Sequence, residues 1–132
     1  MWSRLGGTPG WFDRYEEPGD FERWHAMALA SIIRPVEGYA LGIDCADRWL
    51  STRWGTKLVL TDERVVRFRA DPADPIKQTY WIEDIAEVEH NVSVFTAEMK
   101  LIGDGFYEVC SVPKRLGREF AEAVENTLRR SR

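Results

Sequence analysis

The sequence has few cysteines, no long apolar run and no excess of positive charge. Its two cysteines, Cys45 and Cys110, lie far apart, and neither belongs to a C-x-x-C motif or to a pattern with histidine at metal spacing. This usage favours a reducing cytoplasm over a disulfide-stabilised fold. The longest apolar run, Ala26–Ile33, is interrupted by Ser31 and is too short to span a bilayer. The first residues contain no apolar h-region, so we expect neither a signal peptide nor a transmembrane segment.

The charge balance and the length set further bounds. The chain has 18 Lys and Arg residues against 22 Asp and Glu residues, a net charge of −4, which argues against a nucleic-acid-binding protein. It has 132 residues, of which 44% are hydrophobic and 30% charged. Those values are typical of a globular protein with its own core. We therefore expect a cytoplasmic protein with one main domain.

The N-terminal residues combine turn formers with aromatic side chains. Met1–Gly19 is rich in glycine and proline, which alone is typical of a flexible tail. An aromatic side chain, however, exposes a large apolar area unless it packs against something. We interpret the segment as packing on its own domain, and binding of a partner is the alternative. The four aromatic residues are Trp2, Trp11, Phe12 and Tyr15.

A helix is predicted from Asp20, as N-cap, to about Arg34, and Pro35 ends it. His25 lies beside the apolar stripe of this helix, and we interpret it as a structural residue, with a catalytic role as the alternative. The residues at helical spacing that predict the buried stripe are Phe21, Trp24, Ala28, Leu29, Ile32 and Ile33.

After Pro35 the apolar residues alternate with polar or small ones, which predicts about seven short antiparallel strands. A helix from Pro113 to about Arg130 follows the strands. The sequence therefore predicts an α+β fold in which the last helix caps a strongly curled sheet. The strand segments are Glu37–Cys45, the hairpin Lys57–Arg69, Ile76–Ile82, Ala86–Val94 and the hairpin Glu98–Val112, and the buried stripe of the last helix is Leu116, Phe120, Ala123, Val124 and Leu128.

The pattern also predicts how the two hairpins pair. In the first, a two-residue loop would pair Leu58 with Arg67, whereas a three-residue loop at Asp62–Arg64 would pair Leu58 with Phe68 on one apolar face. We expect the three-residue loop, with Arg64 at positive φ. In the second, a three-residue loop at Gly103–Gly105 gives pairs of matched character, with Gly105 at positive φ. Its pairs are Ile102 with Phe106, Leu101 with Tyr107, Lys100 with Glu108 and Met99 with Val109.

Three segments together resemble a known family. They are TKLVLTDERVVRF, WIEDIAEVE and EVCSVPKRLGREFAEAVENTL, and the most specific piece is the Leu-x-Leu-Thr-Asp-x-Arg-Val corner at Leu58–Val65. Over Val36–Arg130 the chain is similar to a bacterial pleckstrin-homology-like (PH-like) domain of the PH/GRAM type. The resemblance implies a seven-stranded, partly open antiparallel barrel plugged by the C-terminal helix. Residues 1–35 would then be an added aromatic segment and helix, and residues 36–132 the PH-like domain.

The resemblance does not fix a function, because such domains bind phosphoinositides, peptides or other domains, or only assemble. In this family lipid headgroups are commonly bound by basic residues around the loop that joins the first two strands. Arginine forks suit phosphate, and tryptophan suits a membrane interface. The corresponding residues here are Arg48, Trp49, Arg53, Trp54 and Lys57. Packing of both tryptophans under the N-terminal helix is the alternative.

Candidate chemistry elsewhere is weak. Asp44, Cys45 and His90 are the parts of a nucleophile, base and orienting group, but both Cys45 and His90 fall in the inward phase of strands. The acidic clusters lack EF-hand or zinc spacing and are typical of a solvated face. We therefore expect no enzyme, no metal and no cofactor. The leading hypothesis is a binding or scaffold module for a protein partner or for self-association; a peripheral anionic-lipid module is the second, and a small-ligand or catalytic barrel the third.

Overall fold

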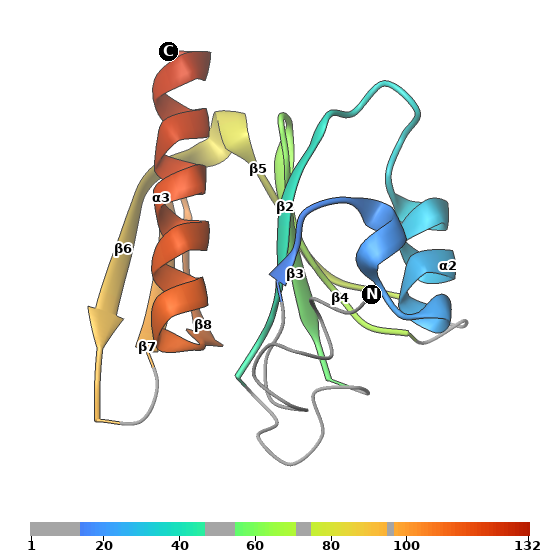
Figure 1. Ribbon diagram of the computed structural model, residues 1–132. Coiled ribbons are helices and arrows are strands. Elements are labelled where there is room, and N and C mark those ends of the chain that lie inside the picture. Colours follow the sequence, from blue (N-terminus) through green and yellow to red (C-terminus); the bar gives the residue numbers. More distant parts are fainter. Residues whose placement is uncertain (1–13, 47–54, 71–74, 95–96) are drawn as a thin grey trace.

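The computed structural model describes residues 14–46, 55–70, 75–94 and 97–132 (Figure 1). These residues form two antiparallel sheets, two α-helices and short 3-10 helices, so the fold is α+β. The elements are β1 (Arg14–Tyr15), η1 (Pro18–Asp20), α2 (Arg23–Ile32), β2 (Tyr39–Asp44), β3 (Lys57–Thr61), β4 (Arg64–Phe68), β5 (Ile76–Trp81), η3 (Ile82–Asp84), β6 (Ile85–Val92), β7 (Ala97–Gly103), β8 (Phe106–Val112) and α3 (Lys114–Ser131).

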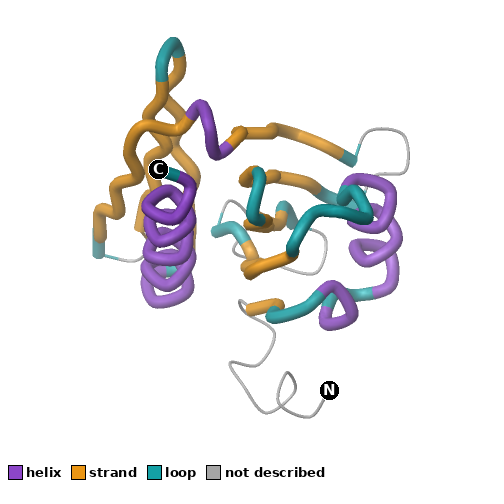
Figure 2. Tube along the Cα trace, turned by 90° about the horizontal axis from the view of Figure 1, so that it is seen from above, coloured by secondary structure: helices purple, strands orange, loops and turns teal. Residues whose placement is uncertain are grey.

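The two sheets and the two helices form layers. One sheet has five strands in the order β1 to β5, the other has three in the order β6 to β8, and the two do not close into one continuous sheet. In Figures 1 and 2, α3 lies beside the three-stranded sheet and against one side of the five-stranded sheet, and α2 lies on the opposite side of the five-stranded sheet. The five-stranded sheet is therefore the middle layer.

Each face of the middle layer has its own apolar core. The face toward α3 contributes Leu58, Leu60 and Val65, which are buried with Phe120 and Val124 of α3. The face toward α2 buries a second set: Tyr15, Phe21, Leu29, Ile32, Val59, Val66 and Phe68. β3 and β4 are consequently buried on both faces, as strands in the interior of a layered domain are.

The predicted register of the first hairpin is wrong. Leu58 lies opposite Arg67 and Leu60 opposite Val65, so the turn has the two residues Asp62 and Glu63. No described residue other than glycine has positive φ, so Arg64 is not strained. The expectation assumed one apolar face and one wet face. Because α2 covers the second face, apolar residues of both phases are buried, and the pattern no longer selects the register.

The register of the second hairpin is also shifted by one residue. Gly103 lies opposite Phe106 and Met99 opposite Cys110, so the turn is Asp104–Gly105, although Gly105 has the predicted positive φ (87°). Gly103 therefore belongs to β7, at a point where there is no room for a side chain. A Cβ at this position would lie 2.2 Å from the Asp84 carbonyl oxygen and from the Phe106 ring. Gly103 thus lets β7 pass close to the corner after η3.

The helices agree with the sequence more closely than the turns do. The terminal helix is confirmed, with Leu116, Phe120, Val124 and Leu128 buried. The N-terminal helix begins at Arg23 rather than after Asp20. Asp20 instead belongs to η1, and its carboxylate accepts hydrogen bonds from the backbone N–H groups of Glu16 and Glu17. The strands expected at Glu37–Cys45, Ile76–Ile82 and Ala86–Val94 correspond to β2, β5 and β6, whereas β1 was not expected.

None of the described helices is long and apolar enough to cross a membrane.

Because both faces of the five-stranded sheet are buried, a substitution on the α2 face should destabilise the fold. Phe68 is fully buried on the α2 face and its ring contacts those of Phe21 and His25. Phe68→Ala should therefore lower the free energy of unfolding by about 3–5 kcal/mol in urea titrations. Tyr107→Ala, at an aromatic position that is 58% exposed, should lower it by under about 1 kcal/mol. Similar small losses in both variants would contradict a packed core beneath α2.

Candidate functional site

The N-terminal half of α2 sits on the sheet through a buried histidine. His25 is 1% exposed, its Nε2 lies 3.3 Å from the Gly55 carbonyl oxygen, and its ring packs edge-on to Phe68 at 6.1 Å. Burial and the nearby Lys57 ammonium lower the pKa of His25 from 6.5 to about 4, although the Gly55 carbonyl favours the protonated ring. The imidazole is therefore neutral near pH 7 and is buried in the contact between α2 and the sheet.

A buried ionic cluster lies close to His25. The Lys57 ammonium forms an ion pair with Asp44 and lies 3.2 Å from the Tyr15 hydroxyl, which donates to Asp44 Oδ1 at 2.8 Å. All three side chains are almost fully buried. For a lysine so placed, the carboxylate and the hydroxyl take the place of the water shell that burial removes. β1 thus holds the Tyr15 hydroxyl where it contacts both members of the ion pair, Asp44 of β2 and Lys57 of β3.

A second buried ionic cluster lies at the C-terminal end of α2. Arg64 makes two hydrogen bonds to the Glu37 carboxylate, at 3.0 and 2.7 Å, and a third to the Ile32 carbonyl oxygen at 2.8 Å. Thr61 and the Arg34 backbone N–H also donate to Glu37, at 2.8 and 3.1 Å. Burial would raise the pKa of Glu37, but these donors outweigh it and lower the pKa to about 2. The cluster therefore fixes the last turn of α2 to the β3–β4 turn.

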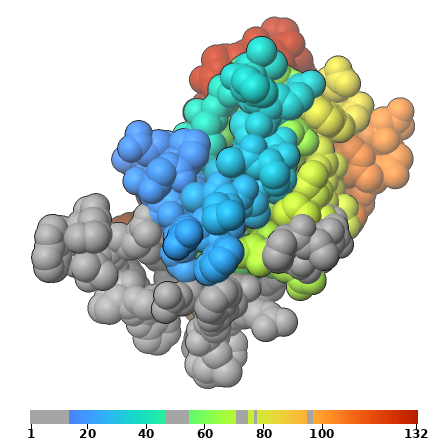
Figure 3. Space-filling model, turned by 90° about the vertical axis from the view of Figure 1, so that its right-hand side faces the viewer, coloured from blue at the N-terminus to red at the C-terminus, as the bar shows by residue number. Residues whose placement is uncertain are grey.

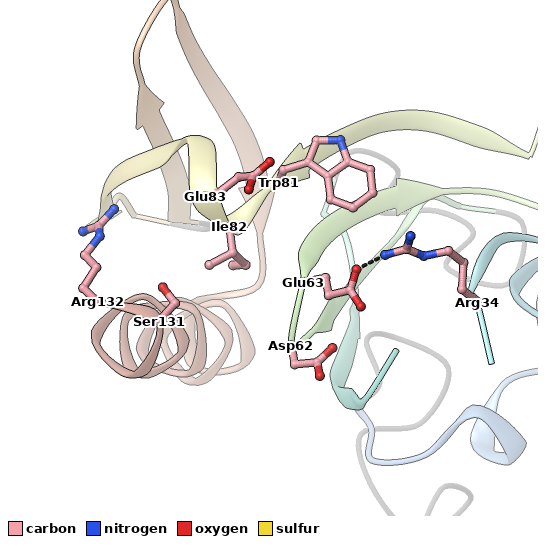
Figure 4. Close-up of a pocket in the computed structure, with 8 residues that line it drawn as sticks. All are labelled: Arg34, Asp62, Glu63, Trp81, Ile82, Glu83, Ser131 and Arg132. Atoms are coloured by element: carbon pink, nitrogen blue, oxygen red, sulfur yellow. Dashed lines mark ion pairs between the residues drawn. The ribbon is translucent and has the colours of Figure 1, made fainter. Parts of the chain in front are cut away.

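An open pocket of about 660 Å³ lies beyond this second cluster, where the β3–β4 turn, η3 and the ends of α2 and α3 meet (Figure 4). Arg34 pairs with Glu63, and its guanidinium lies 5.7 Å from the Trp81 ring. Ser131 donates its hydroxyl to the Leu128 carbonyl at 3.0 Å, so no general base activates it as a nucleophile. The lining of the pocket consists of Arg34, Asp62, Glu63, Trp81, Ile82, Glu83, Ser131 and Arg132.

The outward face of α2 carries large side chains that are more than half exposed. Trp24 was expected in the buried stripe but is 55% exposed, and Met27, one turn further, is also 55% exposed. The buried residues of α2 are instead His25, Leu29 and Ile32. The buried stripe is therefore rotated around the helix axis by about one residue from the predicted stripe. The Arg23 guanidinium lies 5.8 Å from the Trp24 ring. Figure 3 views the molecule from the side on which α2 lies.

The residues predicted to bind lipid or a partner fall into two groups. Arg48, Trp49, Arg53 and Trp54, like Trp2, Trp11 and Phe12, lie outside the described residues. Lys57 and Tyr15 are described, and both are buried in the ionic cluster with Asp44. In this arrangement Lys57 is not exposed to a headgroup, and the burial of Tyr15 agrees with the interpretation that the aromatic segment packs on its own domain. The signal in the sequence was Asp44, which lies directly opposite Lys57 on the neighbouring strand.

The residues weighed for nucleophilic catalysis do not share a site. Asp44 faces α2, whereas its neighbour Cys45 belongs to the core on the α3 side. His90 lies on β6 opposite Met99, with its ring beside Gly117 of α3. Within the described ranges, no group of three or more His, Cys, Asp or Glu side chains is placed to hold a metal ion.

The pKa of His25 predicts a pH dependence. When the pH falls from 7 towards 4, the unfolded chain binds a proton at His25 that the folded chain does not, so stability is lost between about pH 6.5 and pH 4. The loss attributable to this residue is up to about 3 kcal/mol. His25→Gln should flatten this part of the stability profile measured by urea unfolding. Met27→Gln, on the same helix but exposed, should retain the wild-type slope, and a slope unchanged in both would contradict the assignment.

The Asp44–Lys57 ion pair can be tested with a double-mutant cycle. Lys57→Met leaves a buried carboxylate without its cation and should cost about 3–5 kcal/mol of unfolding free energy. Adding Asp44→Asn removes the charge while keeping an acceptor for the Tyr15 hydroxyl, so it should restore much of that loss. Losses that simply add in the double variant would contradict a directly coupled pair.

Comparisons with protein-family models, with curated proteins and with solved structures found no match to this chain.

Proposed function

We propose that this chain is a non-enzymatic PH-like module that docks a protein partner on the outward face of α2. The observation that carries the proposal is the exposure of Trp24 and Met27 on a helix whose opposite face is buried against the sheet. Tryptophan, methionine and arginine are enriched at the centres of protein interfaces. An exposed tryptophan beside an exposed methionine has apolar area that a partner can remove from water.

The order of elements supports the PH-like assignment. β2 to β5 are four consecutive antiparallel strands, β6 to β8 are three more, and α3 follows and contacts both sheets. This is the order that the resemblance implies for a partly open seven-stranded barrel with its terminal helix. The N-terminal elements β1, η1 and α2 are additions, and α2 covers a sheet face that the minimal fold would leave uncovered. The module would thus offer α2 instead of that face.

The anchoring of α2 supports a docking role. Arg64 and Glu37 hold its C-terminal end, and His25 and Phe68 hold its N-terminal half. A helix fixed at both ends presents Trp24 and Met27 in one arrangement, so little side-chain and backbone freedom is lost on binding. Among the described residues no group of His, Cys, Asp or Glu side chains is placed to hold a metal ion, and the proposed module acts by binding.

A membrane-binding role is less well supported. One basic residue near an anionic surface contributes about 1 kcal/mol, and burial of Lys57 leaves only Arg48 and Arg53 of the three expected to act. Their combined contribution of about 2 kcal/mol is opposed by the net charge of −4. We therefore expect no co-sedimentation with anionic vesicles at physiological salt.

A photo-crosslinking experiment tests the docking face. A photoreactive amino acid in place of Met27, expressed in the native host, should give a protein adduct identifiable by mass spectrometry. The same amino acid in place of Glu122, an exposed position on α3, is the matched control and should give no such adduct. Trp24→Ala should abolish the Met27 adduct, because truncating a central tryptophan commonly costs 2 kcal/mol or more.

The outcome also separates a second copy from another protein. If the partner is a second copy, the adduct has twice the chain mass and light scattering shows a dimer that Trp24→Ala dissociates. Absence of an adduct at Met27, together with a monomeric mass, would refute docking on α2.

A further inference from the structure

The three-stranded sheet has a second, uncovered face, on the side away from its core. Along β7, the buried residues Ala97, Met99 and Leu101 alternate with Glu98, Lys100 and Ile102. The first set packs in the core with α3, so the second set points outward. Cross-strand partners extend this outward face over β6 and β8. We call it the outer sheet face.

The outer sheet face is divided into an apolar half and an acidic half. Ile102 lies opposite Tyr107, which is 58% exposed, and Val109, two residues along β8, is 38% exposed. On the other side, Glu87 lies opposite Ile102 and Glu89 opposite Lys100. Cross-strand neighbours of this kind are in direct reach of one another. The face therefore combines exposed aromatic and aliphatic side chains with a row of glutamates.

The outer sheet face carries more negative than positive charge, although Lys100 lies at its centre. The Lys100 ammonium lies 5.9 Å from the Tyr107 ring. A hydrogen bond with Tyr107, with Glu89 and Glu98 nearby, raises the pKa of Lys100. Against this single cation stand Glu87, Glu89 and Glu98, all exposed. An approaching group is thus attracted if it is cationic and repelled if it is anionic.

This asymmetry decides between possible occupants. An anionic membrane or a nucleic acid would meet three glutamates. A second copy stacked by two-fold symmetry would place glutamates against glutamates or against the apolar half, and both arrangements are unfavourable. A segment with apolar side chains along one side and basic side chains along the other matches both halves at once.

We propose that the outer sheet face of β6–β8 is a second docking surface, which binds a basic amphipathic protein segment. Its apolar residues would cover Ile102, Tyr107 and Val109, and its lysines or arginines would lie over Glu87 and Glu89. In Figure 1, α2 and β6 lie at opposite sides of the molecule. The two surfaces can therefore be occupied at the same time, and the chain can act as an adaptor that joins two proteins.

Titration with a synthetic amphipathic helix made only of leucine and lysine tests this surface. Amide chemical shifts in ¹⁵N-labelled protein should change mainly in β6, β7 and β8. Glu87→Gln/Glu89→Gln should weaken the binding about tenfold, since two rim charges are lost. The matched control Glu122→Gln/Glu125→Gln removes two charges from exposed positions of α3 and should change the dissociation constant less than about twofold.

Two further variants separate this proposal from general charge attraction and from docking on α2. Tyr107→Ser should weaken binding of the peptide about tenfold, whereas Val94→Ser, at an exposed position outside the face, should not. Trp24→Ala should leave the binding unchanged, so α2 can fail its own test independently. Equal weakening by the two glutamine pairs, or shift changes centred on α2 or α3, would overturn the assignment of the outer sheet face.

Discussion

Burial of cations on one face of the middle sheet is the constraint on which the rest of the structure depends. Lys57 and Arg64 begin the two strands of one hairpin, and α2 covers both. Each is tolerated because a carboxylate is supplied from another segment, Asp44 from β2 and Glu37 from the loop before it. The clusters also differ at the two ends of the helix. One neighbours the imidazole of His25 and the other binds the carbonyl of Ile32, so α2 fits in only one direction.

Much of the fold could be predicted from the sequence, because periodicity reports burial directly. α3 has one apolar face and one charged face, so its stripe from Leu116 to Leu128 was clear. The strands after the first were equally clear, but the registers of their two hairpins were not. Register is read from the contrast between a dry and a wet face, and β3 and β4 have no wet face. In the other hairpin, the glycine assigned to the turn, Gly103, serves close packing within the strand.

The site residues were harder to predict, because side-chain chemistry does not reveal partners distant in sequence. A lysine beside a loop with two arginines suggests a phosphate site, yet Lys57 is neutralised by Asp44, 13 residues before it. A tryptophan at helical spacing suggests a core, yet the smaller His25 is buried and Trp24 is exposed. Helical phase is uncertain by one position when apolar residues occupy adjacent positions around the helix. That single position decides whether an aromatic ring is buried in the core or exposed to solvent.

The position of the five-stranded sheet between two cores has a consequence for the evolution of this chain. Successive residues of β3 alternate between the core under α3 and the core under α2, as Leu58 and Val59 do. Inserting or deleting one residue in this strand would exchange the two sets, and would drive Lys57 and Thr61 into an apolar core while moving their ionic partners out of reach. Side chains here can be exchanged for others of similar volume, but the length of the strand cannot change. Variation in length is therefore expected in the connections between elements, not in the β3–β4 hairpin.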